Sequence, residues 1–156
     1  EETNETVHLG VQRGEVLVYL DSVESAQMVR TGSRVGWTLQ AHASASGKAL
    51  LAALSDAELQ ILYPDERLPA QTGTTITTRS ALFAQLAEIR ARGYAINNAE
   101  SEGDVSAVGA AVCDSSGRVR GALAVTAPAA RVDAAWIAAC GGAVVRAAEV
   151  LGNRFG

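Results

Sequence analysis

The first group of residues that could carry chemistry is the triplet Ser46-Gly47-Lys48. Glycine-rich turns before helices point free amide groups at anions, so this triplet raises the possibility of a phosphate-binding loop. Such a loop needs glycine five residues before Gly47 and a hydroxyl residue after the lysine, but this chain has His42 and Ala49 there. The triplet predicts only a helix start with small side chains, which either lets a ligand approach the free amides or packs closely on a sheet.

A nucleophilic site would need Cys113 or a serine beside His42 and an acid such as Asp21. The sequence has no Gly-x-Ser-x-Gly elbow, and His42 is typical of a helix-entry residue bonded to the backbone. Cys113 and Cys140 stand far apart in apolar sequence, which predicts buried free thiols. Since His8 and His42 form no ligand pair with either cysteine, we expect no catalytic residue and no metal site.

Other polar and aromatic residues have simpler interpretations. Glu100, Glu102 and Asp104 lie in one polar stretch and are typical of solvated loop charge. Trp136 belongs to an apolar stripe with helical spacing and is predicted to lie in the core. Trp37 stands in a glycine-flanked loop, which favours a lid or an interface.

The composition is that of a globular protein, with 156 residues of which 48% are hydrophobic and 19% charged. This length suits one domain covering residues 1–156. No apolar run approaches the length that spans a bilayer, and the acidic start of the sequence is unlike a secretion signal. We therefore expect a cytoplasmic protein that makes no membrane contact.

The charge balance argues against nucleic-acid binding by these residues. The net charge is −4, with 17 acidic and 13 basic residues, and the basic residues are scattered. Binding to DNA depends on clustered lysine and arginine that neutralise phosphates. This chain alone is therefore predicted not to bind DNA.

The N-terminal half begins with strand patterns and continues with helices. Residues 6–11 and 15–23 predict a β-hairpin around Arg13-Gly14, and residues 28–30 could add a third short strand before a flexible loop at 32–36. A helix is predicted to begin near Ser44. Ser55 and Glu58 match a capping box, which starts a second helix.

The C-terminal half repeats this alternation. A surface connection at 63–78 precedes a helix that ends at a left-handed Gly93, and residues 94–96, 105–113 and 119–126 predict strands. Asp133 can cap a last helix. The buried face of that helix is predicted to carry Trp136, Cys140, Val144, Ala147 and Leu151. Hairpins alternating with helices indicate an α+β fold with a mainly antiparallel sheet.

Several segments together resemble a known family. Residues 18–25, 42–52, 89–95, 108–114 and 122–128 are similar to the effector-binding domain of IclR-family bacterial transcriptional regulators. The resemblance covers nearly the whole chain in order and implies a GAF-like or profilin-like sandwich that senses a small organic molecule, usually an acid or an aromatic metabolite. It also implies dimers or tetramers, no cofactor, and DNA binding only through an N-terminal winged helix-turn-helix domain that this sequence lacks.

The resemblance also implies a ligand pocket. Its expected lining is Met28, Thr31, Leu39, Ala45, Ser46, Asn97, Val105, Ala107, Ala124 and Thr126, and we add the lid candidate Trp37 to these ligand-binding residues. Members that bind small carboxylates tend to have an acid where this chain has Asn97, and hydroxyl or thiol groups where it has Ala107 and Ala124. We therefore expect an effector with an apolar or aromatic body and one polar end, held by the Ser46 amide, Asn97 and Thr126.

Three functions follow as hypotheses. In the first, the chain is a sensor in which the effector orders the loop at 32–39 and shifts subunit packing. The second is a hydrolase-like enzyme on a similar fold, which predicts turnover that His42→Ala abolishes. The third is a structural oligomerisation module, whose melting temperature no metabolite would raise. We expect the sensor and not an enzyme.

Overall fold

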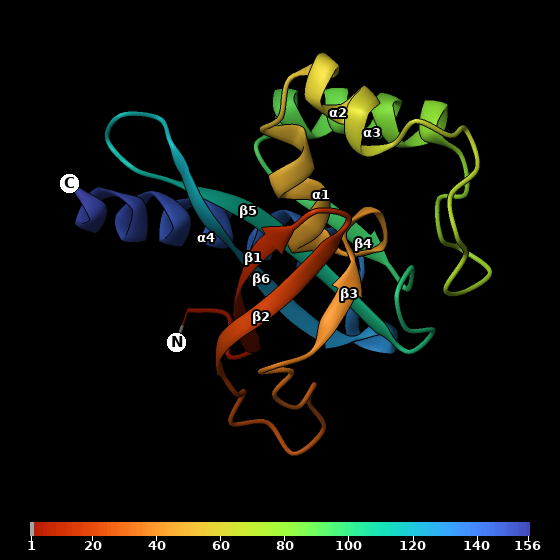
Figure 1. Cartoon of the computed structure of the whole chain (residues 1–156). Helices are drawn as coiled ribbons and strands as arrows, with labels where there is room; N and C mark the ends of the chain where they lie inside the picture. Colours follow the sequence, from red (N-terminus) through yellow and green to blue (C-terminus); the bar gives the residue numbers. More distant parts are fainter. Residues whose placement is uncertain (1) are drawn as a thin grey trace.

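The two hairpins predicted from the sequence form one antiparallel sheet. The computed structural model describes residues 2–156, and its six strands lie in the order β3-β2-β1-β6-β5-β4 (Figure 1). Their bounds are Thr6–Arg13 for β1, Val16–Val23 for β2, Thr38–Gln40 for β3, Ala95–Asn98 for β4, Val105–Cys113 for β5 and Val119–Pro128 for β6. Because β1 pairs with β6, the two hairpins join edge to edge and place residues distant in sequence side by side.

Three helices begin, and one ends, where the sequence predicts. The helices are α1 at Ala45–Ala52, α2 at Asp56–Leu62, α3 at Arg79–Arg92 and α4 at Ala134–Gly152, with 3-10 turns η1 at Ala41–Ala43, η2 at Ala129–Arg131 and η3 at Asn153–Phe155. The side chains of Ser44, Ser55 and Asp133 accept from the first free amides of α1, α2 and α4. Gly93 ends α3 with a φ of 92°, a conformation that side-chain-bearing residues rarely adopt.

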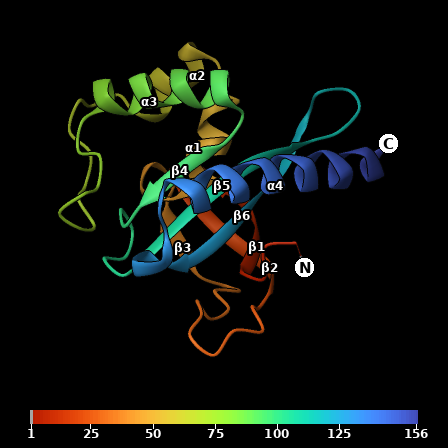
Figure 2. The same cartoon turned by 180° about the vertical axis from the view of Figure 1, so that it is seen from behind.

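Helices cover both faces of the sheet (Figures 1 and 2). On β5, Val108, Ala110 and Val112 pack against α4. The intervening Gly109 lies against the start of α1, since a Cβ atom there would come within 3.0 Å of Ala45 and Ser46 backbone atoms. This alternation is the pleat of a strand buried on both sides. The α+β sandwich predicted from the sequence is therefore confirmed.

Two further clusters complete the core on the α1 side. The first joins α1, α2 and α3 through residues that include Leu51, Leu59, Leu82 and Leu86. The second joins the sheet to α1 through Leu17, Tyr19, Leu50 and Ala122. In the first cluster Ala95 of β4 is the strand residue that joins these helices, and α1 provides most of the connection between the outer helices and the sheet.

Three local predictions are wrong. Residues 28–30 form no strand, because the edge of β2 at Val16–Val18 pairs instead with β3. Cys113 is exposed, because the pairing register shifts after Val112 and turns the end of β5 out of the core. On α4 the buried residue is Ala148 and Ala147 is exposed, because the 3.6-residue period advances the apolar face by one position.

One helix meets the length and composition criteria for crossing a membrane. It runs from Ala134 to Phe155, and its most apolar window has a mean hydropathy of 1.5. The expectation that no run approaches this length is therefore wrong for this segment. The helix packs on the sheet through Cys140, Val144 and Ala148, and the core helix of a globular domain can have the same length and composition.

Candidate functional site

A small cavity lies between the sheet, the start of α1 and the loop that joins β2 to β3. Its volume is about 20 Å³, close to the space that one water molecule needs. The lining residues are His8, Tyr19, Thr31, Arg34, Leu39, Ala45, Asn97, Ser101, Glu102, Val105, Ala107 and Thr126. We call this the inner cavity.

Seven of the eleven residues predicted for the pocket line the inner cavity. They are Thr31, Leu39, Ala45, Asn97, Val105, Ala107 and Thr126. These residues come from six separate segments of the chain, so the fold brings them together. That they bind a ligand remains a prediction.

The other four predicted residues lie outside the lining. Met28 is 96% exposed at the outer end of the loop, and Trp37 is 49% exposed. Ala124 is buried beneath α1, where Gly109 and His8 flank it on the neighbouring strands. Ser46 is buried in the first turn of α1, and its hydroxyl has no hydrogen-bond partner among residues 2–156.

His8 is the lining residue that sequence reasoning missed most clearly. It is fully buried, its ring centroid lies 4.7 Å from that of Tyr19, and neither ring nitrogen makes a hydrogen bond of normal geometry among the described residues, although the Gly32 backbone lies close enough to the ring to oppose part of the pKa shift. Burial, and then the nearby Arg34 charge, lowers the pKa of His8 from 6.5 to about 4. The ring is therefore neutral at pH 7. Its place on the inward side of an alternating strand was the available signal.

Tyr19 adds a hydroxyl that stays protonated. Burial, with the negative charge of Glu102 as a second cause, raises the pKa of Tyr19 to about 12. A neutral imidazole and a phenol can each donate one hydrogen bond. The cavity therefore holds ring donors on the β1 and β2 side, which the sequence prediction of a largely apolar pocket did not include.

An ion pair closes the loop side of the inner cavity. Arg34 Nη2 lies 2.9 Å from Glu102 Oε2, and both side chains are mostly buried. The same guanidinium lies 4.6 Å from the centre of the Trp37 ring. The face of an aromatic ring attracts a cation, so Trp37 and the Glu102 carboxylate both hold the Arg34 guanidinium in place. Arg34 thus joins the β2–β3 loop to the turn before β5.

A larger open groove adjoins this ion pair. Its volume is about 660 Å³, and Thr31, Arg34 and Val105 line both this outer groove and the inner cavity. Further lining comes from the loop at residues 29–32 and from residues 128–130 at the end of β6. The two hollows are therefore neighbours with the loop between them.

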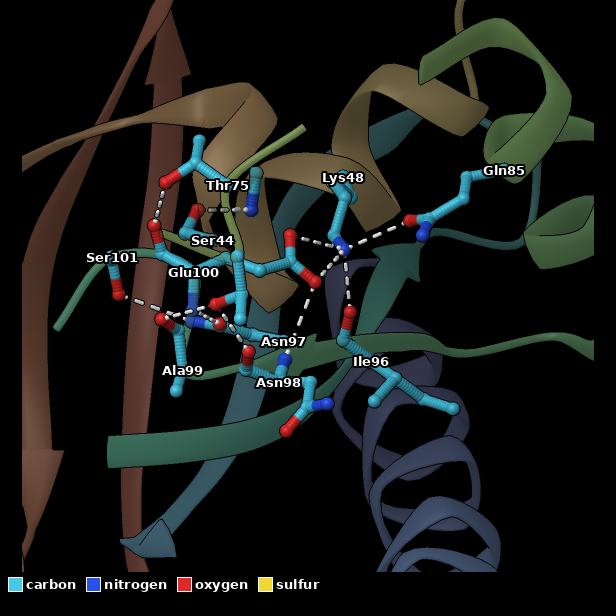
Figure 3. Close-up of polar contacts among 12 residues, drawn as sticks. Ser44, Lys48, Thr75, Gln85, Ile96, Asn97, Asn98, Ala99, Glu100 and Ser101 are labelled. Carbon is cyan, nitrogen blue, oxygen red and sulfur yellow. Dashed lines mark hydrogen bonds and ion pairs between the residues drawn. The ribbon is translucent and has the colours of Figure 1, made fainter. Parts of the chain in front are cut away.

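A buried polar network supports the wall that carries Asn97 and Ser101 (Figure 3). Lys48 on α1 is fully buried and forms an ion pair with Glu100 at 2.8 Å. The Asn97 side chain accepts from the Glu100 amide at 2.7 Å and donates to Ser101 Oγ at 3.1 Å. The interpretation of Glu100 as solvated loop charge is therefore wrong, because its carboxylate balances the Lys48 charge inside the protein.

Burial dominates the environment of Lys48. Loss of hydration lowers the pKa of its ammonium group, and Glu100 opposes this shift. Lys48 also donates to the Ile96 carbonyl at 2.5 Å and to Gln85 Oε1 at 3.0 Å. The lysine of the Ser46-Gly47-Lys48 triplet thus joins α1, α3, β4 and the loop after it.

His42 lies away from the inner cavity, in η1. Its Nε2 is 2.8 Å from the Pro69 carbonyl oxygen, which fits the predicted helix-entry residue bonded to the backbone. Among residues 2–156 the structure gives it no hydrogen bond to a serine, a cysteine or an acid. In the same residues no three His, Cys, Asp or Glu side chains stand close enough to share a metal ion.

The antiparallel sheet with helices packed on both faces defines the structural class, which is an α+β domain with a small cavity under the β2–β3 loop. The model of the family described as bacterial transcriptional regulator IclR C-terminal matches residues 1–152. The chain belongs to this family, as the resemblance in sequence suggested.

Individual relatives agree with this assignment. The chain is 34% identical over 97% of its length to the HTH-type transcriptional regulator BhcR of Paracoccus denitrificans. It is 37% identical over 87% of its length to the HTH-type transcriptional regulator XynR of Escherichia coli. The crystal structure of the Thermotoga maritima IclR superposes with a TM-score of 0.90 at 32% identity, covering 99% of this chain and 62% of that one.

The chain spans about half the length of the curated relatives it matches, 54% of BhcR and 54% of XynR. The relatives are named as transcriptional regulators, so neither the hydrolase nor the ligand-free oligomerisation module gains support from them.

Proposed function

We propose that this chain is the effector-binding domain of a bacterial transcription regulator, and that an acid bound in the inner cavity controls an attached DNA-binding domain. Membership of the IclR C-terminal family supports the regulatory role. The attached domain is the N-terminal winged helix-turn-helix expected from the resemblance. In this proposal the chain carries out no catalysis, assembles as a homodimer or tetramer and works in the cytoplasm.

The observation that carries the effector class is the pair of unpartnered ring nitrogens on buried His8, beside Arg34. Buried polar groups normally have partners, so these atoms mark a place for a polar ligand group. A carboxylate would accept from the His8 N–H and from the Arg34 guanidinium, a charge-assisted donor. The apolar body of the effector would lie against Leu39, Val105 and Ala107.

This assignment differs from the anchor points expected from the sequence, which were the Ser46 amide, Asn97 and Thr126. The Asn97 side chain already bonds the Glu100 amide and Ser101, and Thr126 Oγ1 donates to the Thr6 carbonyl at 3.3 Å. Rearranging those contacts would cost part of the binding free energy. His8, which makes no such side-chain contact, therefore suits the acid group better, and Arg34 joins it when its ion pair with Glu102 opens. Asn97 and Thr126 suit the rim of the apolar body.

Binding of an organic acid requires movement of the β2–β3 loop. The inner cavity holds about 20 Å³, whereas ligand sites are commonly above ~300 Å³. An effector carboxylate would compete with Glu102 for Arg34, and release of that ion pair would join the cavity to the outer groove. The binding free energy would thus be coupled to the loop conformation.

Calorimetric titration tests the proposal with acids and their uncharged amides. We expect benzoate or an aliphatic acid to bind more tightly than the matching amide. Arg34→Gln should weaken acid binding at least about tenfold, because it removes a charge-assisted hydrogen bond. Arg13→Gln, at the exposed hairpin turn, is the matched control and should leave the affinity unchanged. Equal, weak responses to every acid and amide would contradict the proposal.

A further inference from the structure

A second cavity shares no lining residue with the inner cavity. Its volume is about 200 Å³, and it lies between the start of β2, η1 and the segment at residues 63–69. The residues used below are Glu15, His42, Tyr63, Asp65, Arg67 and Leu68, all of which line it. We call it the His42 pocket.

Two buried side chains in the His42 pocket have unused polar atoms. His42 is fully buried and Tyr63 nearly so, and their rings lie edge to face with centroids 6.4 Å apart. Neither His42 Nδ1 nor the Tyr63 hydroxyl has a hydrogen-bond partner among residues 2–156. Both atoms have almost no accessible surface in the structure, so a polar molecule that satisfies them must enter as the segment at residues 63–69 moves aside.

The other His42 nitrogen determines what that molecule must offer. Nε2 lies 2.8 Å from the Pro69 carbonyl oxygen, which can only accept, so Nε2 carries the proton. In the neutral ring Nδ1 is then an acceptor. A ligand group facing Nδ1 must donate a hydrogen bond, which a carboxylate or a fully ionised phosphate does not do.

The charges around the pocket also disfavour an anionic ligand. Glu15, Asp65 and Arg67 line it, and none of them forms an ion pair within the described part of the chain. Two negative groups and one positive group leave an excess of one negative charge, which disfavours an anion. The carboxylates can accept hydrogen bonds from hydroxyl groups, and the arginine can donate hydrogen bonds to them.

We propose that the His42 pocket binds a small, uncharged, polyhydroxylated molecule, a polyol or a monosaccharide. One hydroxyl donates to His42 Nδ1 and another exchanges hydrogen bonds with the Tyr63 hydroxyl. Glu15, Asp65 and Arg67 bind further hydroxyls, and the C–H groups of the ligand contact buried Leu68. The site is separate from the effector cavity and does not depend on the proposed acid.

Two acyclic six-carbon probes that differ in charge test this proposal, namely D-sorbitol and D-gluconate. Calorimetry of the wild-type chain should detect sorbitol binding in the millimolar range or tighter, with gluconate bound more weakly at this site. The side-chain nitrogen spectrum of His42 gives an independent readout, because a new hydrogen bond shifts the Nδ1 resonance.

Two conservative variants locate the binding. His42→Gln keeps a donor for the Pro69 carbonyl and removes the Nδ1 acceptor, and Tyr63→Phe removes one hydroxyl. Each should weaken sorbitol binding about tenfold. Arg34→Gln, in the effector cavity, should leave it unchanged. Tyr63→Phe should fold as well as the wild type, because the atom removed has no partner in the structure.

Three results would overturn the proposal. The first is no sorbitol binding to the wild-type chain, which would leave the pocket to water. The second is sorbitol binding that persists unchanged in both variants. The third is gluconate binding that is tighter than sorbitol binding and that His42→Gln weakens. None of these bears on acid binding that depends on Arg34.

Discussion

Lys48 is fully buried, and its ammonium nitrogen meets four acceptor atoms within 3.0 Å. Breaking a buried ion pair by removing one partner leaves the other charge uncompensated. Lys48→Met should therefore lower the free energy of unfolding by about 3–5 kcal/mol, measured by denaturant titration.

The matched control is Lys48→Met combined with Glu100→Gln. This double variant removes both charges, so it should recover a large part of the lost stability. Arg30→Met breaks an exposed pair with Glu24 and should change stability by less than about 1 kcal/mol. A loss of similar size in Lys48→Met and Arg30→Met would contradict the role of the buried pair.

His8 makes stability depend on pH. Its pKa is lowered from 6.5 to about 4 in the folded chain, chiefly by burial. Between these values the unfolded chain holds a proton on His8 and the folded chain does not, so the free energy of unfolding falls as the pH falls from about 6.5 towards 4. His8→Phe should remove about 3 kcal/mol of this loss.

Denaturant titration at pH 7 and pH 4 measures this difference for the wild type and for His8→Phe. The phenyl ring keeps the aromatic contact with Tyr19 and removes the titrating group. The same pH dependence in both proteins would show that His8 does not titrate as the structure implies. A ring resonance that titrates near 6.5 in the wild type would lead to the same conclusion.

Individual site residues could be predicted from the sequence only in part. Asn97, Ala107 and Thr126 were found because they match a family pattern, and all three line the inner cavity. His8 and Arg34 were missed because a histidine on a strand and an arginine in a loop look ordinary in sequence. Their meeting depends on how the β2–β3 loop folds over β1, which neither local spacing nor composition determines.

Elements with strong local signals were predicted well. The Ser55 and Glu58 capping box and the Gly93 helix end depend on neighbours within four residues, and both are confirmed. Strand β3 was missed because it has only three residues and exists through pairing with Val16–Val18, about twenty residues away. Short edge strands depend on such partners more than on their own sequence.

Two adjacent glycines on α4 test how closely that helix packs. A Cβ atom at position 141 would come within 2.8 Å of three Tyr94 ring atoms, whereas one at position 142 would come no nearer than 3.3 Å to the flexible Arg146 side chain. Gly141→Ala should therefore cost about 1–3 kcal/mol of stability. Gly142→Ala should be neutral or stabilise by up to about 1 kcal/mol, since alanine favours helix.

Thermal and denaturant unfolding measures the stability of the two variants, each of which differs from the wild type by one methyl group. The helix propensity gain is the same at both positions, so the difference between them reports packing alone. Equal stabilities would mean that Tyr94 moves aside freely and that this contact does not fix α4 on the sheet.

At the scale of the whole molecule, the layered arrangement could be predicted because hydrophobic periodicity shows which faces must be covered. Val108, Ala110 and Val112 alternate with Ala107 and Gly109, which indicates a strand buried on both sides. The size of the inner cavity could not be predicted, because it depends on side chains from all six strands, α1 and two loops meeting at one point.

The charge distribution of the whole chain gives the last prediction. The 13 basic residues are outnumbered by 17 acidic ones, and several arginines, including Arg34, Arg120 and Arg131, already pair with carboxylates. Non-specific DNA affinity comes from basic groups that displace counterions, and it is strongest at low salt. Fluorescence anisotropy with labelled duplex DNA at about 50 mM salt should therefore show no binding by this chain. Measurable binding that weakens steeply with added salt would contradict this prediction and would place phosphate contacts within the domain itself. As a positive control, the same measurement on a chain that includes the proposed N-terminal domain should show binding.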